Sequence, residues 1–273
     1  MGVALPYRNY YHGQECPAVA RLGSMILNSV SFGSGSATPL VLLGSLGSSA
    51  EMWLPQLDYF AASRRVIALD HRGHGASTIE GPALIDDLAS DVLSTLDSLG
   101  VTTFDVIGLS LGGAVAQHLA LNSGRVRKLV LTSTAAVFGT PESWTEKAAI
   151  ARSGGLDELS HTVISRWFSP TWIAAHPASL EHWRRMISAT PAEGYAVACG
   201  ALSSFDSTSW LSSIEVPTLV VAGTEDGSTA PEVVRFLADS IPDAEYHEFS
   251  PAAHLLNVER AEDYNRLVEE FLA

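Results

Sequence analysis

Short runs of consecutive apolar residues recur along the chain, and each has the length of a β-strand. Valine, isoleucine and leucine dominate the runs, and few polar residues interrupt them. They lie at residues 39–43, 65–70, 104–108, 128–132 and 218–222. Such runs are typical of parallel strands that are buried on both faces. We therefore expect them to form the middle of a sheet, and a hairpin around residues 18–32 to add antiparallel strands at its edge.

Helical patterns separate the apolar runs. Leu84, Leu88, Val92 and Leu96 recur every four residues, and the pattern stops at Gly100, a residue that suits the C-terminal cap of a helix. Strands and helices that alternate in this way predict an α/β fold. Its sheet should be mostly parallel, with helices on both faces.

The alternation is interrupted between about residues 135 and 213, where the pattern is helical and aromatic and contains no strand-like run. Five of the six tryptophans fall within this segment, at Trp144, Trp167, Trp172, Trp183 and Trp210. We expect most of these rings to attach a helical insertion to the main sheet. One or two of them could line a pocket beneath a lid.

This interruption predicts three parts. Residues 18–134 and 214–273 form an α/β core, residues 135–213 form a helical cap, and residues 1–17 form an N-terminal arm. A chain of 273 residues suits a single α/β domain with an insertion.

Composition narrows the partners and the compartment. With 30 acidic and 16 basic side chains, the net charge of −14 repels phosphate backbones and anionic lipids, so neither nucleic acid nor a membrane is expected as a partner. An anionic substrate would need a local cation. Cys16 and Cys199 alone imply no disulfide framework, and no signal peptide or transmembrane span is evident, which favours the cytoplasm. A homodimer is left open.

One turn indicates the chemistry. The segment 104–113 leads from an apolar strand into Gly-x-Ser-x-Gly and directly into an apolar helix. Glycines at positions 108 and 112 suit a sharp turn, and Ser110 stands at its tip. This context is that of a nucleophile elbow, in which the serine hydroxyl is exposed above a helix N-terminus.

A serine hydroxyl needs a base to take its proton and an acid to orient that base. Asp226 follows the fifth apolar run, and its spacing from Gly223 favours it over the adjacent Glu225. His254 lies in a loop before the last helix. His247 is the competing histidine, but it lies in an alternating, strand-like run that suits a sheet position.

Acyl transfer also requires donors for a developing oxyanion. The amide of Leu111, directly after the nucleophile, is one candidate, and Leu46 in the loop after the first apolar run is the other. His71 and His74 are three residues apart, but no third ligand accompanies them, so we expect a tight bracing loop and no metal site. No dinucleotide fingerprint follows a strand, and no cofactor is implied.

Taken together, these residues resemble the α/β-hydrolase fold family over nearly all of residues 18–273, and 3-oxoadipate enol-lactonases within it. The resemblance rests on motifs in both the core and the cap. They are Gly44-Ser-Leu-Gly-Ser48 with Met52-Trp53, Arg72-Gly-His-Gly75, Gly108-Leu-Ser-Leu-Gly-Gly113, Thr134-Ala-Ala continuing to Gly139-Thr-Pro-Glu-Ser-Trp144, Arg166-Trp-Phe-Ser-Pro170, Ala189-Thr-Pro-Ala-Glu-Gly-Tyr195 and His254-Leu-Leu-Asn-Val-Glu259.

The resemblance implies that Ser110, Asp226 and His254 form a catalytic triad that opens an enol-lactone to 3-oxoadipate in aromatic-acid catabolism. The substrate-binding residues would include Trp144, Val137, Arg72 and Trp167. Val137 stands where such lactonases commonly have an arginine. If that arginine binds the substrate carboxylate, Arg72, Arg152 or Arg166 must replace it here.

Three other functions remain open from the sequence. A general carboxylesterase and a carbon–carbon bond hydrolase would use the same triad on different substrates. A ligand receptor would keep the fold without turnover.

Overall fold

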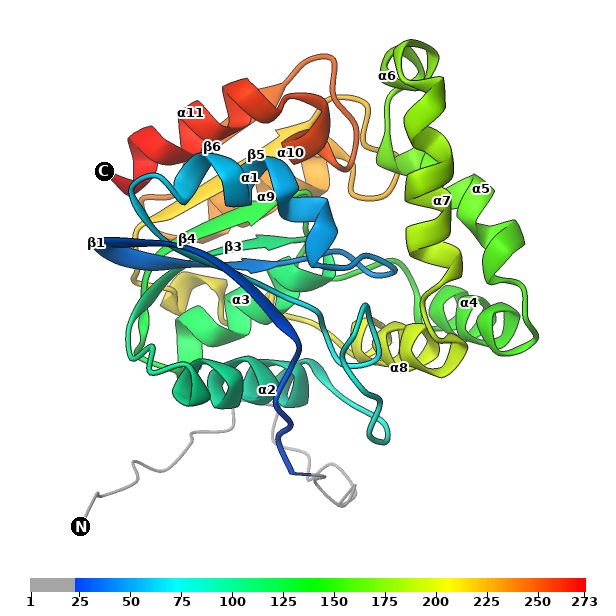
Figure 1. Ribbon diagram of the computed structural model, residues 1–273, viewed down its shortest axis with the longest axis horizontal. Helices are drawn as coiled ribbons and strands as arrows, with labels where there is room; N and C mark the ends of the chain where they lie inside the picture. The colour runs from blue at the N-terminus through cyan, green and yellow to red at the C-terminus, as the bar shows by residue number, and fades with distance from the viewer. Residues whose placement is uncertain (1–22) are drawn as a thin grey trace.

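The computed structural model describes residues 23–273 and contains one six-stranded sheet in the order β2-β1-β3-β4-β5-β6 (Figure 1). The strands are β1 (Ser29–Leu43), β2 (Arg64–Leu69), β3 (Phe104–Leu109), β4 (Val126–Thr132), β5 (Thr218–Gly223) and β6 (Glu245–Phe249). The five apolar runs correspond to β1 to β5. The predicted arm at residues 1–17, together with Cys16, lies outside the described residues.

The sheet is parallel through its centre. Leu40–Leu43 pair with Val66–Leu69 on one side and with Asp105–Gly108 on the other, both in parallel register. The first residues of β1 differ, because Ser29 to Phe32 pair with Leu69 to Val66 in the reverse order. This reversed register matches the expected antiparallel edge. The start of the predicted hairpin, residues 18–22, is outside the described part of the chain.

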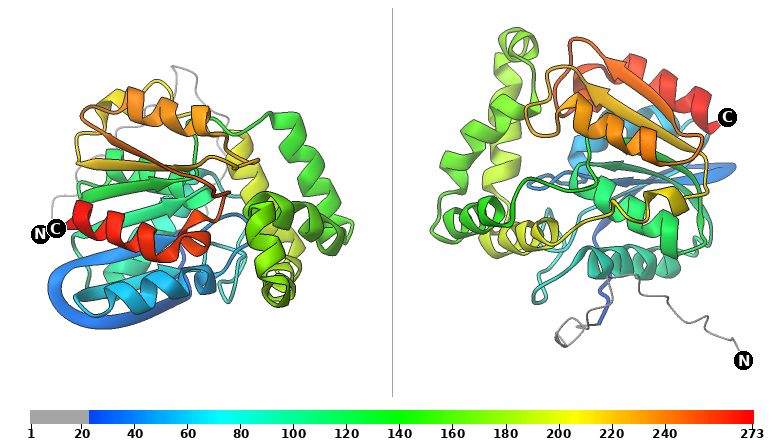
Figure 2. Two further views of the ribbon diagram at one scale, coloured as in Figure 1. Left: turned by 90° about the horizontal axis from the view of Figure 1, so that it is seen from above. Right: turned by 180° about the vertical axis from the view of Figure 1, so that it is seen from behind.

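Helices cover both faces of the sheet, as the alternation predicted (Figure 2). One apolar cluster joins α2 (Ile85–Ser98), α3 (Leu111–Asn122) and α9 (Pro231–Ser240) to side chains such as Val41 and Leu43. The other cluster joins α1 (Leu54–Phe60), α10 (Leu256–Glu259) and α11 (Ala261–Leu272) to Leu40 and Leu42. Successive residues of a strand point to opposite faces, so covering both faces requires the continuous apolar runs.

The insertion between β4 and β5 contains helices and no named strand in the described chain. The α-helices are α4 (Pro141–Arg152), α5 (Leu156–Trp167), α6 (Pro170–Ala175), α7 (Leu180–Ser188) and α8 (Ala192–Ser203). Short 3-10 helices at Pro177–Ser179 and Leu211–Ser213 also lie in this insertion, and another, at Ala50–Trp53, precedes α1 in the core. Figure 1 shows α4 to α8 gathered beside one end of the sheet. No helix among residues 23–273 is both long and apolar enough to cross a membrane.

Aromatic rings consolidate this insertion. Trp167 meets Trp183 edge to face with centroids 6.4 Å apart, and Phe168 stacks on Trp172 at 4.0 Å. Trp210 packs with the cluster that contains α2 and α3. The insertion therefore has an aromatic core of its own, continuous with the core of the sheet.

Candidate active site

The turn between β3 and α3 holds Ser110 in a strained backbone conformation, with φ +55° and ψ −113°. Its neighbours explain why glycine is needed on both sides. A Cβ on Gly108 would lie 2.3 Å from the carbonyl oxygen of Gly112, and a Cβ on Gly112 would lie 2.0 Å from that of Leu43. Strain of this kind persists only where the surroundings enforce it, and it is frequent at functional sites. The predicted elbow is present.

Hydrogen bonds fix the strained turn to the neighbouring strand. The amide of Ser110 donates to the carbonyl of Thr132 at 3.1 Å, and the hydroxyl of Thr134 donates to the carbonyl of Ser110 at 2.7 Å. Gly113 lies against the same threonine, because a Cβ there would be 2.4 Å from Thr134. Ser110 is thus held by β4 as well as by its own strand and helix.

Asp226 and His254 meet directly. His254 Nδ1 donates to Asp226 Oδ2 at 2.8 Å, and both side chains are almost completely buried. Asp226 follows β5 and His254 follows β6, so these residues lie beyond the carboxyl ends of parallel strands, as Ser110 does beyond β3. Ligand sites of open α/β sheets form at this edge. Nδ1 carries the proton, so Nε2 of a neutral His254 is free to accept one.

Three further hydrogen bonds hold the Asp226 carboxylate. The amides of Ser228 and Thr229 donate to Oδ1 at 2.7 and 2.9 Å, and the Thr229 hydroxyl donates to Oδ2 at 2.8 Å. Burial alone raises the pKa of Asp226, but the charge of His254 and these hydrogen bonds outweigh burial and leave the pKa below its ordinary value. Asp226 is therefore ionised. Glu225, the competing acid, is exposed to solvent.

The loop after β1 lies beside the elbow. The amide of Gly112 donates to the carbonyl of Gly44 at 2.9 Å, which ties this loop to the first turn of α3. Leu111 is the first residue of α3, so no carbonyl of its own helix can reach its amide. The amide of Leu46 makes no hydrogen bond within residues 23–273. Both amides named from the sequence are thus free to bind an oxyanion.

The buried side chain of His71 contacts this loop. Its Nε2 donates to the Gly44 carbonyl at 3.1 Å, and complete burial together with the charge of His74 lowers the pKa of His71 to about 3. Burial also lowers the pKa of His74, whose Nδ1 lies 3.1 Å from the Arg72 carbonyl. Both rings are neutral and bonded to backbone. No cluster of three metal-ligating side chains occurs within the described part of the chain.

Arg72 is already paired, which corrects the expectation that it binds substrate. Its guanidinium donates through Nε and Nη2 to the two carboxylate oxygens of Asp91, each at 2.8 Å, and through Nη1 to the carbonyl of Glu80 at 2.7 Å. Both side chains of the pair are at most 1% exposed. The main donors of Arg72 are therefore occupied inside the core, and a substrate carboxylate could not displace Asp91 without burying it unpaired.

The other residues proposed for substrate binding lie in the cap. Trp144 Nε1 donates to the Phe138 carbonyl at 2.5 Å. Val137 is 46% exposed and forms an isolated antiparallel bridge with Asp206. Trp167 is buried against Trp183, so it belongs to the aromatic core of the cap. Arg152, another cation considered for the carboxylate, makes a two-pronged ion pair with Glu193 at the surface.

Sequence reasoning missed the contacts by which α8 approaches the core. A Cβ on Gly73 would lie 2.4 Å from Cα of Gly194, and one on Gly194 would lie 2.1 Å from the Gly73 carbonyl oxygen. A Cβ on Gly47 would lie 3.3 Å from the Tyr195 ring. The two backbones therefore touch, and Tyr195 lies beside the loop that carries Leu46. Tyr195 was within a quoted motif, but nothing in the sequence indicated its partner.

Glu259 joins the cap to the histidine loop, a role that was also missed. Its carboxylate accepts from the amide and hydroxyl of Ser169 at 2.9 and 2.6 Å, and from the amide of Ala253 at 3.0 Å. The amide of Leu255 donates to the carbonyl of Trp167 at 2.8 Å. Ala253 and Leu255, the residues on either side of His254, are thus hydrogen-bonded to Glu259 and to Trp167, respectively. The signal in the sequence for this role of Glu259 was its position at the end of the motif His254–Glu259.

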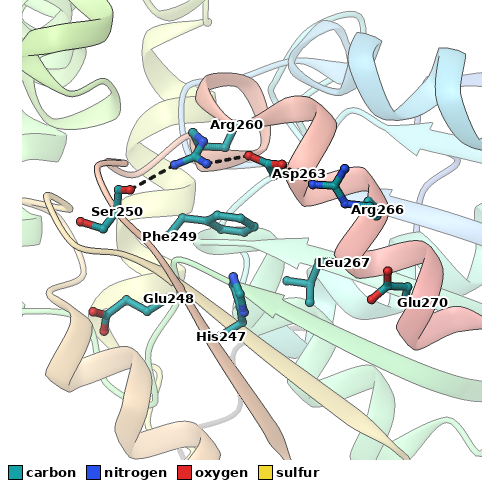
Figure 3. Close-up of a pocket in the computed structure, with 9 residues that line it drawn as sticks. All are labelled: His247, Glu248, Phe249, Ser250, Arg260, Asp263, Arg266, Leu267 and Glu270. Carbon is teal, nitrogen blue, oxygen red and sulfur yellow. Dashed lines mark hydrogen bonds and ion pairs between the residues drawn. The ribbon is translucent and has the colours of Figure 1, made fainter.

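A pocket of the described chain is lined by neither Ser110, Asp226 nor His254. Figure 3 shows it between β6 and α11, with His247, Phe249 and Leu267 at its centre and Arg260 bonded to Asp263. His247 is part of β6 and meets Phe249 edge to face at 4.5 Å, as expected for a sheet position. The competing histidine therefore contacts a different surface from Asp226.

Comparison with known proteins agrees with this geometry. The sequence matches a family model described as "Alpha/beta hydrolase family" over residues 40–267. It is 36% identical to 3-oxoadipate enol-lactonase 2 of Acinetobacter baylyi over 89% of this chain and 91% of that protein. The structure is similar to the enol-lactonase of Burkholderia xenovorans (TM-score 0.87, 36% identity, 90% and 96% coverage). It is also similar to a malate-bound esterase of Thermogutta terrifontis (TM-score 0.85, 29% identity, 90% and 92% coverage).

Proposed function

Because the chain belongs to the α/β hydrolase family, we propose that it is a serine hydrolase that opens a small carboxylated lactone, 3-oxoadipate enol-lactone being the leading substrate. The observation that carries the proposal is the 2.8 Å bond between His254 and an ionised Asp226 beyond the same sheet edge as the strained Ser110. The similarity to two enol-lactonases, which hydrolyse an ester bond within a ring, supports the substrate class.

The first step forms an acyl-enzyme. Ser110 Oγ attacks the lactone carbonyl while Nε2 of His254 takes the hydroxyl proton, and Asp226 stabilises the resulting imidazolium. The amides of Leu46 and Leu111 would donate to the oxyanion, each contributing about 3–4 kcal/mol where it is essential. The ring C–O bond then breaks, and the leaving enol oxygen receives the proton from His254. The enol converts to the ketone.

The second step releases the product. A water molecule attacks the acyl carbon while His254 again accepts a proton, and the bond to Ser110 Oγ breaks as that oxygen is reprotonated. The products are the free carboxylate and the restored serine. In the described residues no hydrogen bond joins Ser110 to His254, a looseness common before substrate binds.

Two assays on the same protein test the proposal. Lactone opening is followed beside hydrolysis of a neutral aryl acetate, and labelling with a fluorophosphonate reports on Ser110. We expect lactone opening in the parent and a loss of at least about 10⁴-fold in kcat, with no labelling, in Ser110→Ala. Parent enzyme that hydrolyses the acetate but leaves the lactone intact would be a general esterase, the alternative that the Thermogutta terrifontis similarity favours.

A further inference from the structure

One cation of the cap has no anionic partner. Lys147 on α4 forms no ion pair and no hydrogen bond with the part of the chain that the structure describes. Its Nζ lies 4.0 Å from the centroid of the Trp144 ring, one helical turn earlier, and the side chain is partly buried. By contrast Arg152, on the same helix, is paired with Glu193. A cation–π contact stabilises an ammonium only modestly and leaves its donors free.

No carboxylate of residues 23–273 lies within ion-pair distance of Lys147. Burial and, to a smaller extent, the charge of Arg166 lower the pKa of Lys147. Burial raises the pKa of Cys199 to about 12 and also raises that of Tyr195, so both α8 side chains are neutral. Lys147 is partly removed from water and has no anion beside it, whereas Arg166 is exposed. A part-buried ammonium without an anion is an unfavourable arrangement that a bound anion would relieve.

The neighbours of Lys147 reach the loops around the triad. Tyr195, on the helix that packs against α4, touches Gly47 beside Leu46. Arg166, in the last turn of α5, passes Gly227 beside Asp226, where a Cβ would lie 3.8 Å from the arginine Cγ. Tyr195 and Arg166 therefore lie on the side of the cap that faces the oxyanion loop and the acid loop, and Lys147 lies on the helix that packs against the helix of Tyr195.

We propose that Lys147, with Arg166 beside it, binds the carboxylate of the acid substrate. This inference rests on the proposed function and names its specificity determinant. The Trp144 ring, 4.0 Å from the ammonium, orients it. The arrangement supplies the local cation that the net charge of −14 demands, at a position where neither Arg72 nor Val137 can act.

The test compares Lys147→Met, which keeps the length and loses the charge, with Lys147→Arg and with Arg152→Met, a control on the same helix. For the carboxylated lactone we expect Lys147→Met to raise KM about 10- to 100-fold, the effect of losing one charge-assisted hydrogen bond. Its kcat and its hydrolysis of aryl acetate should change less than about threefold. Lys147→Arg should recover most of the affinity, and Arg152→Met should behave as the parent.

A second measurement separates this inference from the lactonase proposal. Adipate should inhibit aryl acetate hydrolysis competitively, and its inhibition constant should rise about 10-fold or more in Lys147→Met only. This result requires no lactone turnover; if the parent hydrolyses neither ester, calorimetric titration with adipate gives the same comparison. Equal affinity of parent and Lys147→Met for adipate, or no adipate binding by the parent, would overturn the assignment.

Discussion

Replacing Arg72 by methionine should destabilise the protein rather than weaken substrate binding. Arg72 and Asp91 form two hydrogen bonds of 2.8 Å, and both side chains are at most 1% exposed. Removing the arginine leaves the Asp91 carboxylate buried with the amide of Met25 as its remaining donor from outside α2. Breaking such a pair costs about 3–5 kcal/mol, a large part of an ordinary stability of about 5–15 kcal/mol.

Urea unfolding followed by tryptophan fluorescence measures this change, and thermal unfolding should show a midpoint lower by about 6–20 °C. Two variants sharpen the comparison. Arg152→Met removes an exposed ion pair and should cost at most about 1 kcal/mol. The double variant Arg72→Met with Asp91→Leu removes both buried charges, so it should recover much of the loss.

Kinetics at low temperature then separate the two roles of Arg72. If the pair is structural, the folded fraction of Arg72→Met has a KM ratio between the carboxylated lactone and a neutral ester close to that of the parent. A variant with parental stability and a KM raised only for the lactone would refute this reasoning and return Arg72 to the substrate site.

Three further results are expected. Gly112→Ala should lose about 3 kcal/mol or fail to fold, since its Cβ would overlap the Leu43 carbonyl, whereas Gly200→Ala, with open space on α8, should be neutral or stabilising in the same urea assay. Glu259→Gln replaces one of the two carboxylate oxygens that accept hydrogen bonds from Ser169 and Ala253. We expect kcat to fall about 10-fold for lactone and aryl ester alike and the free energy of unfolding to fall by about 1–2 kcal/mol. The control Glu262→Gln, at an exposed position, should change neither quantity. His71 has a folded-state pKa of about 3 against an ordinary 6.5, so it stabilises the fold above pH 6.5 and loses that contribution as pH falls toward 3, by up to about 1.4 kcal/mol per pH unit; a His71→Asn variant whose unfolding free energy kept the parental pH slope would contradict this.

The sequence predicted those parts of the fold that local pattern determines. The runs at 104–108 and 218–222 are continuous because both sides of β3 and β5 are covered, and the elbow could be located because Gly108 and Gly112 have no room for a Cβ. Asp226 could be chosen over Glu225 because of its spacing from Gly223. The pairing of Asp226 with His254 remained an inference from chain order until the strands placed their loops together.

Assignments that depend on distant partners could not be made in this way. Arg72 was available as a candidate substrate cation because nothing in the sequence marks its pairing with Asp91, which lies on α2. Lys147 was overlooked, although its spacing of three residues from Trp144 would place the two side chains together on a helix. That no acid of the cap pairs with Lys147 depends on how α4, α5 and α8 pack, which no local pattern encodes.

The contact between Gly73 and Gly194 limits how this enzyme could be recombined with its relatives. Each glycine occupies the space that a side chain on the other would need, so the pair acts as a shared joint between two stretches of chain far apart in sequence. In a chimera that received a foreign helical insertion with alanine in place of Gly194, the added Cβ would push α8 away from the Gly73 loop. Transplanting a new substrate preference into this scaffold therefore requires that both halves of the joint be carried together.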